Sequence, residues 1–371
     1  CHLLPGPEAQ QLATWIGWRL HGTRGGLAAG LLFVIPGALI MLGLSILYAL
    51  AAGVGWFAAL FLGVKAAVLA LVVQALLRIA GRALDTRLKQ ALAVSAFLAL
   101  ALFALPFPVA VLGAGLIGFA VAALRPDLLA LKPAGEARRL PPRPWAASLR
   151  AVLIWGAIWA LPMALILALL GRDHVLWQIG SLFSQLAVVT FGGAYAVLAY
   201  MAQEAVSGFG WLQPGEMADG LGLAETTPGP LILVTQFVGY LAAFRAPEPF
   251  TPLVAGILGA ALTTWVTFAP CFLWIFAFAP WIERMDQAVR LKGALAAVTA
   301  SVVGVIASLA LWFGGHVLFR SYANGLPVWA SLDWRAAVLS MICAVLLFRL
   351  KWGVLPVLGT AALGGLIFTQ F

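Results

Sequence analysis

Long apolar runs follow one another along the whole sequence, and they constrain the fold more than any other feature. A helix needs about 20 mostly apolar residues to cross the hydrocarbon of a bilayer, and a backbone in lipid must satisfy its own hydrogen bonds. Hydrophobic residues make up 63% of the chain and charged residues 9%, whereas about a quarter of a soluble domain is charged. We therefore predict an all-α integral membrane protein with about eleven membrane segments. The predicted segments are 25–50, 56–78, 89–105, 107–124, 149–170, 176–206, 228–244, 251–280, 288–314, 335–349 and 353–370.

Basic residues are concentrated in two polar stretches, 78–89 and 125–148. The chain carries 22 Lys+Arg against 13 Asp+Glu, a net charge of +9, and these stretches hold most of the excess. Cytoplasmic loops of membrane proteins have this bias, so the charge predicts membrane topology and not nucleic-acid binding. The proline-rich stretch 125–148 is typical of an exposed linker. It divides the chain into two predicted halves, 1–124 and 149–371.

Four sequence blocks occur in the same order in each half, which indicates an internal repeat. Pro5-Gly6-Pro7 aligns with Pro228-Gly229-Pro230, and Pro36 aligns with Pro270. The other pairs are 63–73 with 293–303 and 112–118 with 358–364. When the basic stretches are placed in the cytoplasm, the aligned segments of the two halves cross the membrane in opposite directions. The sequence thus predicts inverted-topology repeats, which are typical of secondary transporters.

Each Pro-Gly-Pro triplet predicts a broken or re-entrant helix within the membrane, because proline blocks helix continuation and glycine allows unusual dihedral angles. Such a break must be buried or line a cavity. The helix that starts after it directs free N–H groups and a positive dipole end at the gap, which favours an anion. The alternative is a simple proline kink. Polar candidates beside the triplets are Glu8, Gln11, Thr227 and Gln236, which could equally be interhelical contacts.

Lys65 is an ionisable residue near the centre of the apolar segment 56–78. Such residues are costly in lipid and usually functional, so Lys65 is a candidate cation for a bound anion. The alternative is a lysine that snorkels or pairs with a carbonyl group.

Further candidates precede the second triplet. Phe191, Gly192 and Gly193 predict either a second break or a close helix contact. Glu204, Glu216 and Glu225 are candidates for proton coupling, because partial burial brings a carboxyl group towards the working pH range; the alternative is a set of solvated carboxylates near the membrane interface. Asp219 belongs to the same acidic stretch.

Catalytic and metal-binding patterns do not occur in the sequence. It has no GxSxG, HExxH or GxxxxGK[ST] motif, and neither its Cys nor its His residues have metal-ligand spacing. We expect no enzyme activity, no metal and no cofactor.

The segments LLPGPEAQQLATWIGWRLHGTRGG at 3–26, FGGAYAVLAYM at 191–201 and GWLQPGEMADGLGLAETTPGPLILVTQFVGY at 210–240 closely resemble the chromate ion transporter (CHR) family. The resemblance implies a two-domain secondary carrier, an antiporter in the cell (inner) membrane, that exports chromate with the proton-motive force. Sulfate has the same charge and shape as chromate, so a site built from helix dipoles would separate the two only weakly, and the choice between chromate and sulfate-like oxyanions stays open. It implies site residues in the first half at Pro5, Gly6, Pro7, Glu8, Gln11 and Lys65. In the second half it implies Phe191, Gly192, Gly193, Glu204, Glu216, Pro228, Gly229, Pro230 and Gln236.

Three expectations remain beside this resemblance. Family members begin with an FGG-bearing segment ahead of the first triplet, so we expect that the first half lacks an element of about 40–60 residues. We also expect a homodimer in the lipid bilayer. The alternative function is a non-transporting membrane scaffold or receptor subunit that retains the repeat fold.

Overall fold

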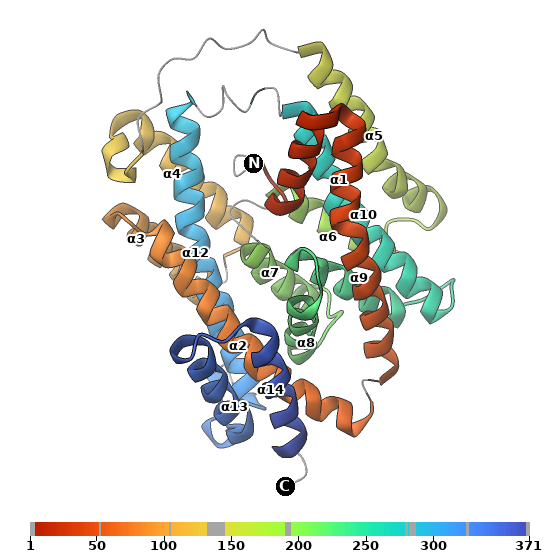
Figure 1. Cartoon of the computed structure of the whole chain (residues 1–371), viewed down its shortest axis with the longest axis vertical. Helices are drawn as coiled ribbons and strands as arrows, with labels where there is room; N and C mark the ends of the chain where they lie inside the picture. The colour runs from red at the N-terminus through yellow and green to blue at the C-terminus, as the bar shows by residue number, and fades with distance from the viewer. Residues whose placement is uncertain are drawn as a thin grey trace.

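The computed structural model is built almost entirely from helices (Figure 1). It describes residues 1–371 except 1–3, 52, 104, 132–144, 190–193, 279–280, 282–286, 324–325 and 369–371. The first half of the described chain contains α1 (Glu8–Ala51), α2 (Gly55–Ala83), α3 (Arg87–Phe103), α4 (Phe107–Leu124) and a 3-10 turn η1 (Pro126–Leu129). Next come α5 (Trp145–Leu169), α6 (Val175–Val189), α7 (Ala194–Gln203), α8 (Pro214–Thr226), α9 (Val234–Arg245) and α10 (Pro252–Phe278). The last helices are α12 (Val289–Leu318), α13 (Trp334–Ala344) and α14 (Val354–Phe368), and β1 (Tyr322–Ala323) pairs antiparallel with β2 (Leu326–Pro327).

Six of the described helices are long and apolar enough to cross a membrane, namely α1, α2, α4, α5, α10 and α12. Val175–Val189, Leu231–Arg245 and Val354–Phe368 are shorter apolar helices. The predicted all-α membrane class is therefore confirmed. Other predicted segments form shorter helices. Segment 89–105 corresponds to α3 and segment 335–349 to α13.

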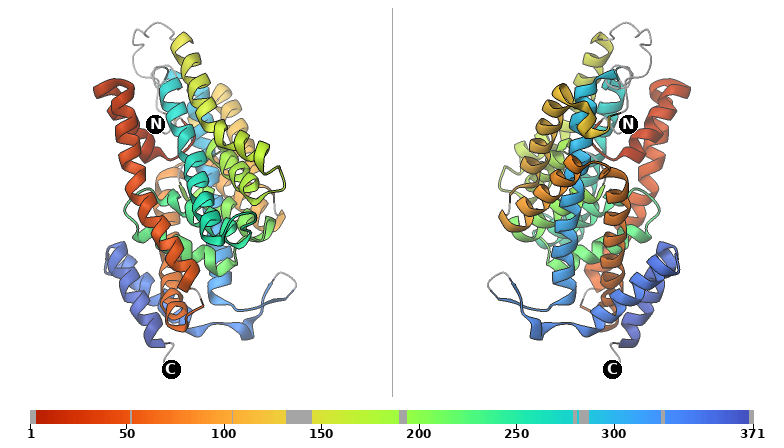
Figure 2. Two further views of the ribbon diagram at one scale, coloured as in Figure 1. Left: turned by 90° about the vertical axis from the view of Figure 1, so that its right-hand side faces the viewer. Right: turned by 90° about the vertical axis from the view of Figure 1, so that its left-hand side faces the viewer.

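The first helix, α1, is two limbs joined at His21 and Gly22, whose backbone angles are not helical (φ −135° and +63°). A Cβ atom on Gly17 would overlap the backbone of Gly25 and lie 2.8 Å from Ala29 Cβ. The limbs 8–20 and 23–51 therefore pack antiparallel and closely at small residues. Figure 2 shows the short limb folding back beside the long one, so the start of α1 lies in the interior.

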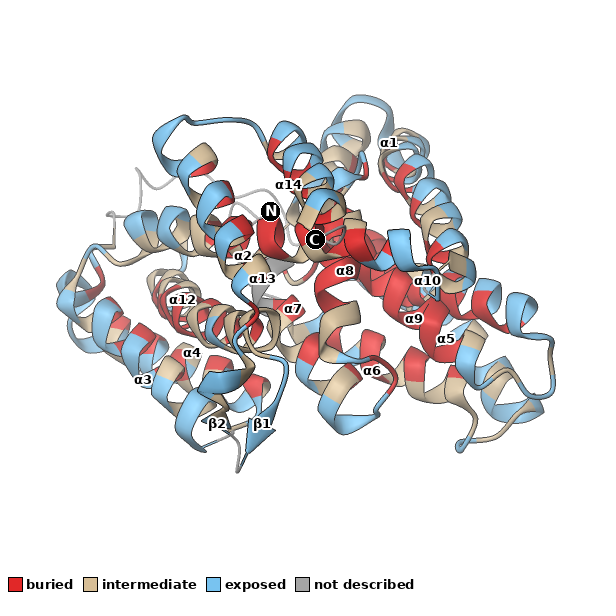
Figure 3. Ribbon diagram, turned by 90° about the horizontal axis from the view of Figure 1, so that it is seen from below, coloured by how far each residue is buried: buried red, intermediate tan, exposed pale blue. Residues whose placement is uncertain are grey.

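The second triplet forms the tip of a helical hairpin made by α8 and α9. Gly220 on α8 packs against Phe237 and Val234 of α9, and nearer the start of α8 Glu216 pairs with Arg245 at the end of α9. These pairs place the two helices side by side and antiparallel. Helix α9 then packs against α10, where Gly239 and Gly259 approach each other closely. Figure 3 shows α8 and α9 largely buried in the middle of the molecule.

Glycines also set the other close helix contacts. On α12, Gly293 meets Gly118 of α4, and Gly304 meets the backbone of Ala93 on α3. On α2, Gly63 meets the backbone of Ala361 on α14. Small residues let helices approach closely in lipid, where the hydrophobic effect does not drive their association. Of these helices, α2, α12 and α14 also pack against α8 and so support the hairpin.

Candidate functional site

The first triplet is followed at once by a helix. The backbone φ of Gly6 is +111°, α1 begins at Glu8, and the Gln11 amide donates to the Pro7 carbonyl at 3.1 Å. A Cβ atom on Gly6 would lie 3.0 Å from Cys271 Sγ on α10. The first turn of α1 is therefore held against the second half of the chain, with its N-terminus in the interior.

Two glutamines in the first turns of α1 are fully buried. The side-chain amide of Gln11 donates to the Pro5 carbonyl, and that of Gln10 donates to Thr14 Oγ1 at 3.0 Å. The side-chain oxygen of each has no hydrogen-bond partner among the described residues. Buried polar atoms are nearly always satisfied, so these oxygens mark a place where a polar molecule would be accommodated. Glu8 lies in the same first turn.

The second triplet separates α8 from α9. Helix α8 ends at Thr226, Gly229 has a φ of +143°, and a 3-10 turn (Leu231–Leu233) leads into α9. Thr227 Oγ1 donates to the Leu223 carbonyl at 2.8 Å and so caps the end of α8. Pro228 and Gly229 are exposed. Both triplets are thus followed by a new helix start, and the second one also ends a helix.

The two triplets contact each other's halves in a reciprocal way. Gly6 approaches Cys271, the residue after Pro270, while Gly229 lies 3.4 Å from a Cβ built on Gly37, the residue after Pro36. Pro36 and Pro270 are the pair that the repeat alignment predicts. Each break is therefore packed against the same point of the other half's long helix.

Those long helices, α1 and α10, run in opposite directions. A Cβ on Gly26 would lie 3.0 Å from Phe276, and Gly30, one turn further along α1, faces Phe272, one turn earlier on α10. Figure 1 shows the same opposition, with the long limb of α1 running downward and α10 upward.

Gln236 ties the second hairpin to α1 and α10. Its amide nitrogen donates to the Ala38 carbonyl at 2.9 Å, and its oxygen accepts from Thr264 Oγ1 at 3.0 Å. Both ends of this side chain are occupied in this conformation. Gln236 therefore positions the tip of the hairpin.

Lys65 pairs with a carboxylate that the sequence analysis did not select. Its Nζ lies 3.4 Å from Asp219 Oδ2, and Tyr48 donates to the same oxygen at 2.7 Å. A Cβ on Gly215, in the first turn of α8, would lie 2.9 Å from Lys65 Nζ. Lys65 is thus near the start of α8, whereas the second triplet follows its end. A helix of 13 residues is about 20 Å long. The length of α8 therefore separates Lys65 from the second triplet.

Glu216 forms the base of the α8–α9 hairpin. Both of its carboxylate oxygens accept from the Arg245 guanidinium, which also donates to the Trp211 carbonyl at 2.7 Å. The same carboxylate accepts from the Gln213 amide at 2.7 Å and completes a capping box at the start of α8. The geometry makes Glu216 a fixed structural link.

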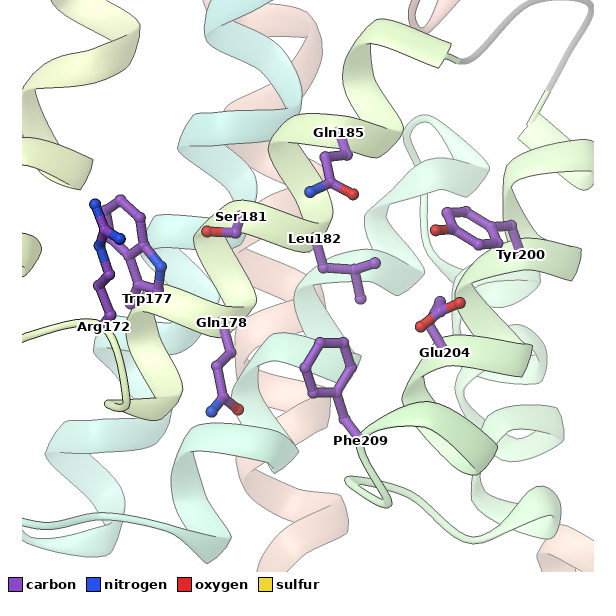
Figure 4. A pocket seen from close by; sticks show the side chains of 9 residues that line it. All are labelled: Arg172, Trp177, Gln178, Ser181, Leu182, Gln185, Tyr200, Glu204 and Phe209. Atoms are coloured by element: carbon purple, nitrogen blue, oxygen red, sulfur yellow. The ribbon is translucent and has the colours of Figure 1, made fainter. Parts of the chain in front are cut away.

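Glu204 lines a cavity of about 280 Å³ between α6 and α7 (Figure 4). It lies in the π-helical turn Glu204–Gly208 that follows α7. Gln178, Ser181 and Gln185 of α6 supply a polar wall, and Arg172 is the basic residue of the lining. Glu225 lines a different cavity, which also contains Arg78. Phe191, Gly192 and Gly193 lie outside the described residues.

Comparison with known proteins identifies the family. The family model described as "Chromate transporter" matches residues 1–119 and 177–366. The chain belongs to the chromate transporter family. A "Chromate transport protein" of Pseudomonas aeruginosa is 35% identical over 309 residues, which cover 82% of this chain and 67% of the relative. A "Chromate transport protein" of Cupriavidus metallidurans is 26% identical over 372 residues, covering 98% and 80%. No solved structure matches the chain.

Membership of this family, with six long apolar helices, makes the chain a multi-pass membrane transport protein and not an enzyme. Sequence reasoning identified the triplets and Lys65, but it left Tyr48 and Arg245 out of the site. Each residue has a position in the sequence that could have drawn attention to it, since Tyr48 lies at the end of an apolar run and Arg245 directly follows one. Their partners lie 171 and 29 residues away, and no local pattern reveals such pairs.

Proposed function

We propose that this protein is a secondary active transporter that exports chromate across the cell (inner) membrane as a proton-coupled antiporter. The names of its relatives and its family support chromate as the substrate. Chromate is a tetrahedral dianion, and sulfate has the same charge and shape. The proposal therefore includes sulfate-like oxyanions as further substrates.

The observation that carries the proposal is the pair of helix starts behind the triplets. Each helix begins in the interior after a glycine of positive φ, and each break packs against the residue that follows Pro36 or Pro270 in the other half. A helix N-terminus offers unpaired N–H groups and about half a positive charge. Two such ends at equivalent points suit a dianion near the boundary of the halves.

The repeat organisation is part of the proposal. The family model matches two stretches, and the opposite directions of α1 and α10 support inverted copies in 1–124 and 149–371 with 125–148 as the linker. Inverted halves can rock about a central site and expose it to each side in turn. We include a homodimer in the proposal, which cross-linking in native membranes would test.

The substrate-binding set consists of groups at the triplets and in the segment before the second triplet. We propose the backbone of Pro5-Gly6-Pro7 and Pro228-Gly229-Pro230 as the anion contacts, with Glu8, Gln11, Thr227 and Gln236 shaping the gap. Phe191, Gly192 and Gly193 are proposed by motif alone. Lys65 contributes positive charge from the far end of α8, and Glu204, Glu216 and Glu225 remain proposed proton-coupling carboxylates.

Chromate flux into inside-out vesicles tests the proposal, with Gly229→Leu as the disruptive variant. A side chain at a φ of +143° strains the break and would lie against Gly37, so the variant should lose at least about tenfold in initial rate, the equivalent of 1.4 kcal/mol. Gly43→Leu is the matched control, because a Cβ on Gly43 meets no atom within 4 Å.

Equal chromate flux in Gly229→Leu and Gly43→Leu would contradict the assignment of the triplets. Absence of chromate flux from vesicles that contain the correctly folded parent would contradict the transport function itself.

A further inference from the structure

Asp219 is the most deeply buried carboxylate of the described chain for which a pairing is seen, with a side-chain exposure of 4% against 28% for its partner Lys65. Its Oδ2 takes the hydrogen bond from Tyr48 and faces Lys65 Nζ, while its Oδ1 is buried with no hydrogen-bond partner among the described residues. An ionised carboxylate with one bare oxygen in a dry interior is costly. A proton would reduce that cost, and one side of the pair, at Lys65, is accessible.

Three helices meet at this carboxylate. Tyr48 comes from the end of α1, Lys65 from the middle of α2, and Asp219 from α8. Helix α8 leads directly into the second triplet. The protonation of Asp219 therefore affects how strongly α8, the helix that precedes this triplet, is held to α1 and α2.

The other charged groups near Asp219 are Glu216 and Arg245, which pair with each other. Glu216, one turn earlier on α8, accepts hydrogen bonds from the two terminal nitrogens of the Arg245 guanidinium, and arginine stays protonated in proteins. The helices α12 and α14 also pack against α8, and their buried residues include Val302, Val305 and Val357. Lys65 and Tyr48 thus favour the ionised form of Asp219, whereas burial and the Glu216 carboxylate disfavour it.

The other carboxylates proposed for proton coupling have different surroundings. Glu216 is locked in its salt bridge, and Glu204 and Glu225 each line a cavity whose lining includes an arginine. Protonation of Asp219 changes an ion pair and a hydrogen bond between three helices at once.

We propose that Asp219 is a further proton-binding residue of the transport cycle, in a proton site with Lys65 and Tyr48 that is separate from the triplets. The inference rests on the proposed function. When it is ionised, Asp219 holds α8 to α1 and α2 through the Tyr48 hydrogen bond and the Lys65 ion pair. A proton from water on the Lys65 side converts the carboxylate to a carboxylic acid, Lys65 keeps its charge, and the electrostatic hold on α8 is lost. Helix α8 and the triplet behind it are then free to move.

Reconstituted full-length chain in proteoliposomes tests the inference with two measurements. The first is chromate counterflow without a pH gradient, which requires the carrier but no net proton movement. The second is chromate efflux with and without an inward proton gradient. Asp219→Asn mimics the protonated side chain permanently. Asp85→Asn is the control, because Asp85 is half exposed between α2 and α3 and pairs with Lys89 at 2.7 Å, away from α8.

The expected result is that the proton gradient accelerates efflux several-fold in the parent and in Asp85→Asn, but not in Asp219→Asn, while counterflow persists in all three. Acceleration of Asp219→Asn by the gradient would overturn the inference, whereas a parent that counterflows but ignores the gradient would overturn the proton coupling of the proposed function. Absence of counterflow in the parent would instead overturn the proposed function, so the two failures are distinguishable.

Tyr48→Phe provides the second variant if Asp219→Asn does not fold. It removes one donor to the ionised carboxylate and leaves Lys65 in place, so Asp219 should bind its proton more readily. The pH at which the gradient effect is half-maximal should rise by up to about one unit. An unchanged midpoint in a folded Tyr48→Phe protein would overturn the inference.

Discussion

At the scale of single residues, Gly6 and Gly229 in the two triplets are the glycines of the described residues that combine a positive φ with tight packing. Gly6 (φ +111°) faces Cys271, and Gly229 (φ +143°) faces Gly37. Residues with a Cβ rarely adopt such angles, and holding one there costs about 1–3 kcal/mol. We expect Gly6→Ala and Gly229→Ala to lower the thermal unfolding midpoint in detergent. Gly43→Ala, at a helical position with open space around it, should raise or preserve it.

Unfolding midpoints that are the same for all three alanine variants would show that the triplets relax without strain. In that case the breaks would not require glycine, and their role as fixed helix starts would be wrong.

The triplets and Lys65 were predictable from the sequence because each breaks a local rule, a helix breaker or a charge inside an apolar run. Asp219 was visible only as one member of an acidic stretch. Its importance depends on Tyr48 and Lys65, which reach it across 171 and 154 residues of sequence. Long-range packing decides which carboxylate of the stretch is buried, and helical periodicity in a short, weakly amphipathic helix does not.

At the scale of elements, the α8–α9 hairpin is closed at its base by Glu216 and Arg245 and anchored near its tip by Gln236. We expect a double-mutant cycle with Glu216→Gln and Arg245→Gln to give a coupling energy of about 0.5–3 kcal/mol. The pair is partly exposed, with side-chain exposures of 17% and 42%, so solvent screening should place the value in the lower half of that range. Chemical denaturation in detergent measures it.

The two single variants and the double variant act as mutual controls in that cycle. Strictly additive effects would mean that the bidentate pair does not hold the base of the hairpin, and α9 would then depend on packing against α10 alone.

The chain reversal inside α1, at His21 and Gly22, could not be predicted from the sequence. The triplet correctly predicted a helix start, and segment 25–50 correctly covers most of the long limb. The turn at His21 and Gly22 carries no proline and lies beside Gly25 and Gly26, which remain helical. The close packing of Gly17 on Gly25 stabilises that turn, and this contact exists only after folding.

Helix contacts at glycine give a second prediction at this scale. A Cβ on Gly63 would overlap the backbone of Ala361, which cannot move away as a flexible side chain can. We expect Gly63→Ala to push α2 and α14 apart and to cost about 1–3 kcal/mol of stability. Gly359→Ala on α14 is the control, since no atom lies within 4 Å of its added Cβ. A stable Gly63→Ala protein in thermal scans would contradict the observed α2–α14 contact.

At the scale of the whole molecule, apolar side chains face outward over much of the surface. The most apolar stretch of 18 residues in α5 has no buried residue. Large residues such as Leu153, Leu161 and Leu169 are exposed on this helix. Such a surface is stable in lipid and would aggregate in water. The composition was sufficient to predict this, because apolar content and run length fix the class of protein before any packing is known.

The molecule as a whole also limits substrate selectivity. Anion contacts made by backbone N–H groups and helix dipoles recognise charge and shape, and they offer no clash or unpaired group that would reject sulfate. We therefore expect sulfate to inhibit chromate flux with an affinity within about tenfold of chromate's own, a difference of 1.4 kcal/mol or less. Initial chromate rates in proteoliposomes against increasing sulfate measure this, with chloride at equal ionic strength as the control. Chromate flux that withstands a large excess of sulfate would require a selective side-chain contact, and the triplet backbones alone would not explain the site.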